Sequence, residues 1–135
     1  MPEQANGPFE VKLTPQPSQE GCSDPSIGRL AIAKRFQGDL DATSLGQMLA
    51  FRSSVDGSAG YVAIERVVGK LHGRSGSFVL QHSGTMDRGT PGLSVTVVPD
   101  SGTEELAGLA GRMAIVAEGK QHTYSFDYTL PPPPG

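Results

Sequence analysis

The stretch of sequence that decides the fold is YVAIERVV, residues 61–68, within the longest β signal of the chain, residues 60–71. Successive side chains of a strand point to opposite faces. One face carries Tyr61, Ala63, Glu65 and Val67, and the other carries Val62, Ile64, Arg66 and Val68. Both faces are largely apolar, which is typical of a strand covered on both sides. We therefore expect a barrel wall that packs against a second subunit, and hence a homo-oligomer.

The rest of the chain predicts a series of short strands. They are expected at residues 9–13, 29–37, 43–52, 60–71, 77–82, 93–97, 113–117 and 122–130. Segment 43–52 also fits a helix, because Leu45, Met48 and Leu49 recur at helical spacing, but its alternation and its neighbours favour a strand. Eight strands with short connections predict an all-β protein, a closed antiparallel barrel of the lipocalin type. Closure leaves no exposed edge strand.

The connecting segments predict turns, one short helical turn and two terminal extensions. The sequence Ser101-Gly102-Thr103-Glu104 has the form of a capping box, so a helical turn should begin there and end near residue 108 or 111. Residues 83–92 are expected to form a polar loop. We expect a flexible N-terminus over residues 1–8, a barrel domain over residues 9–130 and a stiff proline-rich tail over residues 131–135.

Composition and charge exclude several classes of function. The net charge is −3 and the eleven lysines and arginines are dispersed, so no basic face for nucleic acid is expected. No apolar run approaches the roughly 20 residues of a membrane span, and the first residues lack the features of a secretion signal. The single cysteine, Cys22, cannot form an internal disulfide, which favours a reducing compartment. We therefore expect a cytoplasmic protein without nucleic-acid or membrane partners.

Four motifs, in order along the chain, carry a resemblance to a known family. They are KRFQGDL at residues 34–40, GSAGYVAIERV at 57–67, GRSGSFVLQHSG at 73–84 and VVPDSGT at 97–103. From about residue 9 to residue 130 the chain resembles a bacterial family of uncharacterised domains whose barrel is similar to plant allene oxide cyclase. The resemblance implies this barrel and a possible site for an apolar ligand. The plant enzymes convert an unstable fatty-acid epoxide into a cyclopentenone, but none of their catalytic positions is matched residue by residue.

Glu65 is the strongest candidate for a chemical role. It stands mid-strand among apolar neighbours, where a carboxylate is costly unless it is paired. Lys34 is likewise a charge on the apolar side of its expected strand, so the two residues are candidate partners. Burial would raise the pKa of the carboxyl, and a nearby ammonium would lower it. Glu65 is either a general acid or base or a member of a structural ion pair.

His82 and the three tyrosines are the other candidate site residues. His82 shares a face with Phe78 and Leu80, which favours it over Gln81 as the side chain that points inward. The phenols of Tyr61, Tyr124 and Tyr128 would reach the pocket or lie in the core.

Cofactor and metal sites are not expected. The sequence has neither a phosphate loop nor a dinucleotide-binding motif, so we expect no cofactor. The three histidines, His72, His82 and His122, lack the close spacing of metal ligands, so we expect no metal.

Two hypotheses about function remain. In the first, the barrel holds a small, largely apolar molecule that Glu65, His82 and the tyrosines orient, with a cofactor-free isomerase or cyclase as its catalytic form. In the second, the lumen is filled with side chains and the protein is a structural or interaction module. Its outer residues Val62, Ile64 and Val68 would then form the contact between copies. A void of a few hundred cubic ångströms in the lumen favours the first.

Overall fold

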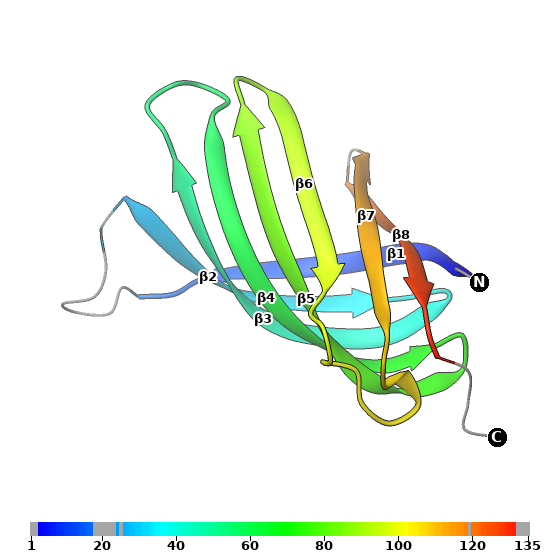
Figure 1. Cartoon of the computed structure of the whole chain (residues 1–135). Coiled ribbons are helices and arrows are strands. Elements are labelled where there is room, and N and C mark those ends of the chain that lie inside the picture. The colour runs from blue at the N-terminus through cyan, green and yellow to red at the C-terminus, as the bar shows by residue number, and fades with distance from the viewer. Residues whose placement is uncertain (1–2, 18–23, 25, 119, 132–135) are drawn as a thin grey trace.

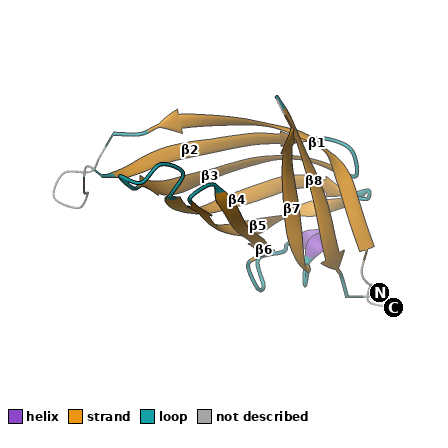
Figure 2. Ribbon diagram, turned by 90° about the horizontal axis from the view of Figure 1, so that it is seen from above, coloured by secondary structure: helices purple, strands orange, loops and turns teal. Residues whose placement is uncertain are grey.

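The chain folds into a closed antiparallel barrel in which each strand pairs with the next along the sequence (Figure 1). The computed structural model describes residues 3–17, 24, 26–118 and 120–131. Its strands are β1 (Glu3–Pro15), β2 (Ile27–Phe36), β3 (Leu40–Arg52), β4 (Ala59–Leu71), β5 (Arg74–Asp87), β6 (Thr90–Val97), β7 (Ala110–Glu118) and β8 (Gln121–Thr129). A 3-10 turn, η1 (Glu104–Leu106), precedes β7 at one end of the barrel (Figure 2). The all-β class, the eight-stranded closed barrel and the single helical turn are confirmed.

The barrel closes where β1 pairs with β8, for example Phe9 with His122. The pairing between β6 and β7 is much shorter, since only Thr96 and Arg112 are in register there. Every other pair of neighbouring strands is in register over seven or more residues. No helix in the part of the chain that the structure describes is long and apolar enough to cross a membrane.

Two expected irregular segments are in fact strand. Residues 3–8 were expected to be flexible, but β1 begins at Glu3, which pairs with Tyr128. Residues 83–92 were expected to form a polar loop, but β5 and β6 continue through most of them. The connection is a two-residue turn, in which Arg88 and Gly89 both have positive φ. Turns of this kind match the twist of a hairpin, so the two strands extend to the turn and place polar side chains outside.

The capping box is also wrong in its details. The residue before η1 is Thr103, and its side chain makes no capping hydrogen bond. Ser101 instead accepts a hydrogen bond from the backbone N–H of Val79 at 3.0 Å, which ties the loop to β5. The helical turn is therefore held by packing of Leu106 in the core rather than by its cap.

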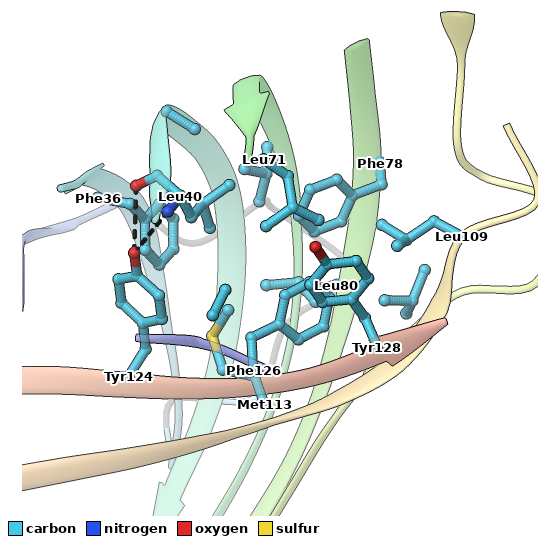
Figure 3. Close-up of a cluster of buried hydrophobic side chains, with 14 of the residues drawn as sticks. Phe36, Leu40, Leu71, Phe78, Leu80, Leu109, Met113, Tyr124, Phe126 and Tyr128 are labelled. Carbon is cyan, nitrogen blue, oxygen red and sulfur yellow. Dashed lines mark hydrogen bonds between the residues drawn. The ribbon is translucent and has the colours of Figure 1, made fainter. Parts of the chain in front are cut away.

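A hydrophobic core fills one end of the lumen (Figure 3). Leu71, Phe78, Leu80 and Phe126 pack there with no more than 1% of their surface exposed. The Tyr124 hydroxyl closes this end from the side of β8, because it donates to the carbonyl of Gln37 at 2.6 Å and accepts from the N–H of Leu40 at 2.8 Å. Two hairpin segments far apart in the sequence are joined in this way.

The strand β3 has small residues on its inner face. Ala42 and Ser44 point inward and are buried, whereas Leu45 and Leu49 point outward and are exposed. Gly46 pairs with Glu65, and a Cβ on Gly46 would lie 2.6 Å from the Cα of Glu65. Because the obstacle is backbone, it cannot move aside. The close approach of β3 to β4 at this point therefore requires glycine.

Replacing Gly46 with alanine should lower the free energy of unfolding by about 1–3 kcal/mol, the usual cost of overpacking. Urea denaturation followed by circular dichroism measures the change. Gly28→Ala is the matched control, because its new Cβ would meet nothing closer than the carbonyl oxygen of Ala50 at 3.9 Å. Its free energy of unfolding should stay within about 0.5 kcal/mol of the wild type. Equal losses in both variants would contradict the argument from close approach.

Candidate functional site

A cavity of about 730 Å³ occupies the end of the lumen that the core leaves empty. Most of the side chains that line it are apolar, and they come from both sides of the barrel. Among them are Val11 and Leu13 of β1, Ile32 of β2, Met48 of β3, Ala63 of β4 and Ile115 of β7. The rim residues Leu13, Phe51, Met86 and Leu93 are 40–46% exposed. The cavity therefore opens to solvent through an apolar rim. The lumen of this barrel is not filled throughout with side chains.

The floor of the cavity is polar and is organised around the carboxylate of Glu65. Lys34 donates from Nζ to Oε2 at 2.8 Å, and His82 contacts the same oxygen through Nε2 at 2.5 Å. Ser44 donates to Oε1 at 2.8 Å. Glu65 has no exposed surface, and the other three side chains are buried. The sequence-predicted pairing of Lys34 with Glu65 is thus present, and Ser44 and His82 complete it.

Strand register explains why these four side chains meet. Lys34 on β2 pairs with Ser44 on β3, and Glu65 on β4 pairs with the next inward position of β3, Gly46. His82 on β5 pairs with Ala63, one inward position from Glu65. The four residues therefore lie at one height of the wall, between the core and the cavity.

Hydrogen bonds and charge keep Glu65 ionised. Burial raises the pKa of the carboxyl, but the hydrogen bond from His82 and the charge of Lys34 outweigh it. The net result is a pKa lowered from 4.5 to about 2. A carboxyl with so low a pKa is a weak base near neutral pH. Its arrangement suits it to hold Lys34 and His82 in place.

His82 and Tyr61 border the cavity together. His82 points inward as predicted, while Gln81 is exposed. The ring of Tyr61 lies with its centroid 6.3 Å from that of His82. It covers Gly84, its cross-strand partner, where a Cβ would clash with the ring. Burial and the charge of Glu65 raise the pKa of the Tyr61 phenol, so the phenol stays protonated near neutral pH and can donate a hydrogen bond.

The other two predicted tyrosines lie away from the cavity. Tyr124 and Tyr128 belong to the hydrophobic core at the opposite end of the lumen. The hydroxyl of Tyr128 forms a hydrogen bond with Nδ1 of His72 and donates another to the carboxylate of Glu3 at 2.8 Å. Burial, together with Glu3, raises its pKa. These two residues share the inward face of β8 with His122, but only His122 lines the cavity.

Several residues of the polar floor and of the cavity lining were not predicted from the sequence. Ser44 binds the carboxylate, and His122 lines the wall with its ring against Phe9. Nζ of Lys34 lies 5.3 Å from the centre of the Phe9 ring, a distance that allows a cation–π interaction. The inward parity of His122 was visible in the sequence, and it was weighed only as a metal ligand. Cys22, which the sequence places in a loop, falls outside the described residues.

The pH dependence of stability should report the buried carboxylate. A carboxyl with a lowered pKa stabilises the folded state above its unfolded pKa and loses that contribution as the pH falls. For Glu65 the loss should occur between pH 4.5 and about 2. Glu65→Gln should cost about 3–5 kcal/mol at pH 7, because Lys34 is left unpaired. It should also show a shallower loss of stability below pH 4.5 than the wild type, measured by urea denaturation.

Two further variants control this experiment. Glu10→Gln removes an exposed carboxyl of β1 and should keep the wild-type pH profile. Ser44→Ala keeps both charges and removes one hydrogen bond to the carboxylate, so it should cost about 1.5–3 kcal/mol, less than Glu65→Gln. If Glu65→Gln and the wild type lose stability in parallel below pH 4.5, the carboxylate is not the source of the effect.

Comparison with known proteins places the chain in a family. The profile of the family described as "Protein of unknown function (DUF3224)" matches residues 5–128. A search of curated proteins gave no match. Among solved structures, a DUF3224 protein of unknown function from Shewanella oneidensis MR-1 is 49% identical, with a TM-score of 0.90. The match covers 98% of this chain and 99% of that one. The predicted membership in an uncharacterised barrel family is confirmed: this chain belongs to the DUF3224 family.

Proposed function

We propose that the barrel binds a small, largely apolar molecule in its lumen, with the polar end of that molecule against Lys34 and His82. The observation that carries the proposal is a cavity with apolar walls and one polar floor. Its volume, about 730 Å³, lies within the usual range of ligand pockets, roughly 300–1,000 Å³. A few placed polar groups in an apolar pocket are typical of sites that orient a ligand.

The hydrogen bonds of the floor indicate what the polar end of the ligand should be. Both oxygens of Glu65 already accept from protein groups. Lys34 has three ammonium protons, and one of them is used on Glu65. The floor therefore offers donors rather than free acceptors on this carboxylate. A carbonyl, carboxylate or hydroxyl oxygen fits it best.

The apolar rim supports the same function. Phe51, Met86 and Leu93 expose large apolar surfaces around the opening. Exposed apolar surface around a concavity often marks a binding site.

The single cysteine of the chain is consistent with action in the cytoplasm. The finer likeness to allene oxide cyclase stays a prediction from the sequence.

A second candidate function is an interaction module that assembles with copies of itself. It is favoured by the outer face of β3 and β4, which exposes several large apolar side chains side by side. They are Leu45, Leu49, Val62, Ile64 and Val68, each 49–73% exposed. This function is compatible with ligand binding, because the outer face and the cavity use opposite sides of the wall.

Ligand binding should raise the melting temperature. A bound molecule at 100 times its Kd stabilises the folded state by about 2.7 kcal/mol, or roughly 10 °C for a domain of this size. We expect such shifts with members of a panel of 2-undecanone, decanoic acid, 1-undecanol and β-ionone, measured by differential scanning fluorimetry. Ala50→Trp, which places an indole in the cavity, should abolish the shifts. Ala114→Trp, on the exposed outer face of β7, should keep them. A flat response of the wild type to the whole panel would contradict the proposal.

The assembly of copies is tested separately by sedimentation velocity. If the β3–β4 outer face is the contact, the wild type should sediment as an oligomer. Ile64→Lys should then shift it to a monomer by placing a charge in an apolar interface. Ala114→Lys, at an exposed outer position of β7 and thus away from β3 and β4, is the matched control. A wild type that is still monomeric at a protein concentration of about 100 µM would contradict the proposal that the chain is an interaction module.

A further inference from the structure

His82 joins the buried carboxylate to the cavity. Its Nε2 contacts Oε2 of Glu65, and its ring lines the cavity. An ionised carboxylate only accepts hydrogen bonds, so Nε2 must carry the proton. In the neutral imidazole the other nitrogen, Nδ1, then has a free lone pair. Nδ1 of His82 has no hydrogen-bond partner among the described residues. Every fully buried side-chain nitrogen or oxygen of those residues does have a hydrogen-bond partner. Nδ1 is therefore accessible, and the ring borders the cavity.

A positive charge lies next to this base. Nζ of Lys34 and Nε2 of His82 both contact the same oxygen of Glu65. The distance between the two nitrogens is therefore at most the sum of these two contact distances. Lys34 also lines the cavity. One small group of a ligand, such as a carbonyl with its neighbouring carbon, can therefore reach both the ammonium and the imidazole.

We propose that the cavity catalyses proton transfer at the carbon next to the carbonyl of an apolar ketone, with His82 as the base and Lys34 as the group that polarises the carbonyl. The inference rests on the proposed ligand-binding function and adds a reaction class to it. It gives the proton-transfer role to His82 and makes Glu65 a positioning residue.

The step is balanced within the site and needs no other reactant. Nδ1 of His82 takes a proton from the α carbon, and the electrons of that C–H bond form a C=C bond. The carbonyl π electrons move to oxygen, and the ammonium of Lys34 stabilises the resulting enolate. The imidazolium of His82 is stabilised by the ionised Glu65. If the proton on Nδ1 exchanges with solvent before one returns to the same carbon, the α hydrogen is replaced; in an unsaturated ketone, return to the conjugated carbon isomerises it.

Glu65 acts through its neighbours. Its Oε2 fixes the His82 tautomer and the position of the Lys34 ammonium, while Ser44 holds its other oxygen. Such an orienting carboxylate selects which ring nitrogen carries the proton. Its lowered pKa agrees with this role, because the carboxylate stays charged throughout the reaction.

The test is hydrogen exchange of ketones in D₂O. 2-Undecanone and 2-tetralone, a linear and a bicyclic probe, are incubated with the protein, and loss of their α hydrogens is followed by proton NMR. We expect at least one of them to exchange about 100-fold faster than in buffer, the lower end of general-base catalysis. Binding is measured in parallel from the shift in melting temperature.

Variants assign the proton transfer to His82. His82→Gln keeps an N–H donor for Glu65 and removes the base, so exchange should fall to the buffer rate while the melting-temperature shift persists. Gln81→Asn, at the adjacent exposed position, should exchange like the wild type. If His82→Gln does not fold, His82→Ala with added imidazole should recover exchange in a concentration-dependent manner.

The tautomer gives a test that a purely structural role would not satisfy. Nitrogen-15 NMR of the labelled protein should show that the neutral ring of His82 carries its proton on Nε2 and none on Nδ1. In Ser44→Ala, which retains the ion pair, the same tautomer should persist. A protonated Nδ1 in the neutral ring would overturn the proposal.

The outcomes separate this inference from the proposed function. Ketones that shift the melting temperature but exchange at the buffer rate overturn the inference and leave ligand binding intact. The same holds if only alcohols, acids or terpenoids without enolisable hydrogens bind. Wild-type exchange in His82→Gln also overturns it. If no apolar probe binds at all, both the inference and the proposed function fail.

Discussion

The shared carboxylate of Glu65 is the constraint on which the rest of this structure depends. A charge without exposed surface is tolerated only when its partners replace the water it has lost. Here Lys34, His82 and Ser44 supply those partners from three other strands. A register slip of one residue in β4 would turn Glu65 outward and Arg66 inward. The polar layer therefore fixes the pairing of β2 to β5 more strictly than the apolar contacts alone.

The same layer divides the lumen into two parts with different tasks. On one side of this layer, the aromatic and leucine side chains of the core are packed so closely that almost none of their surface is exposed. On the other side of the layer, the walls of the barrel are still apolar but enclose a cavity of about 730 Å³. An empty apolar cavity costs stability, because its lining lacks partner atoms. The packed end offsets that cost, so the other half of the lumen need not be filled for the barrel to fold.

The sequence predicted the fold and part of the polar layer for a clear reason. A period of two assigns each residue to a face, and Lys34, Glu65 and His82 stood out as polar groups on apolar faces. Alternation says nothing of height along the barrel axis, which depends on register and tilt. Tyr61 and Tyr128 both point inward, yet only Tyr61 reaches the cavity. Ser44 was missed because a lone serine between small residues gives no signal until its distant partner is known.

The strand β3 shows why hydropathy alone could not place the inner face everywhere. Two of its large apolar residues, Leu45 and Leu49, are outside, whereas the middle of its inner face is built from Ala42, Ser44 and Gly46. The reason is volume: the wall of β4 approaches so closely at Gly46 that no side chain fits. On the outer face, Leu45 and Leu49 lie beside the apolar outer residues of β4. The close approach of β3 to the backbone of Glu65 thus explains why the inner face carries no side chain at position 46, where alternation alone predicts one.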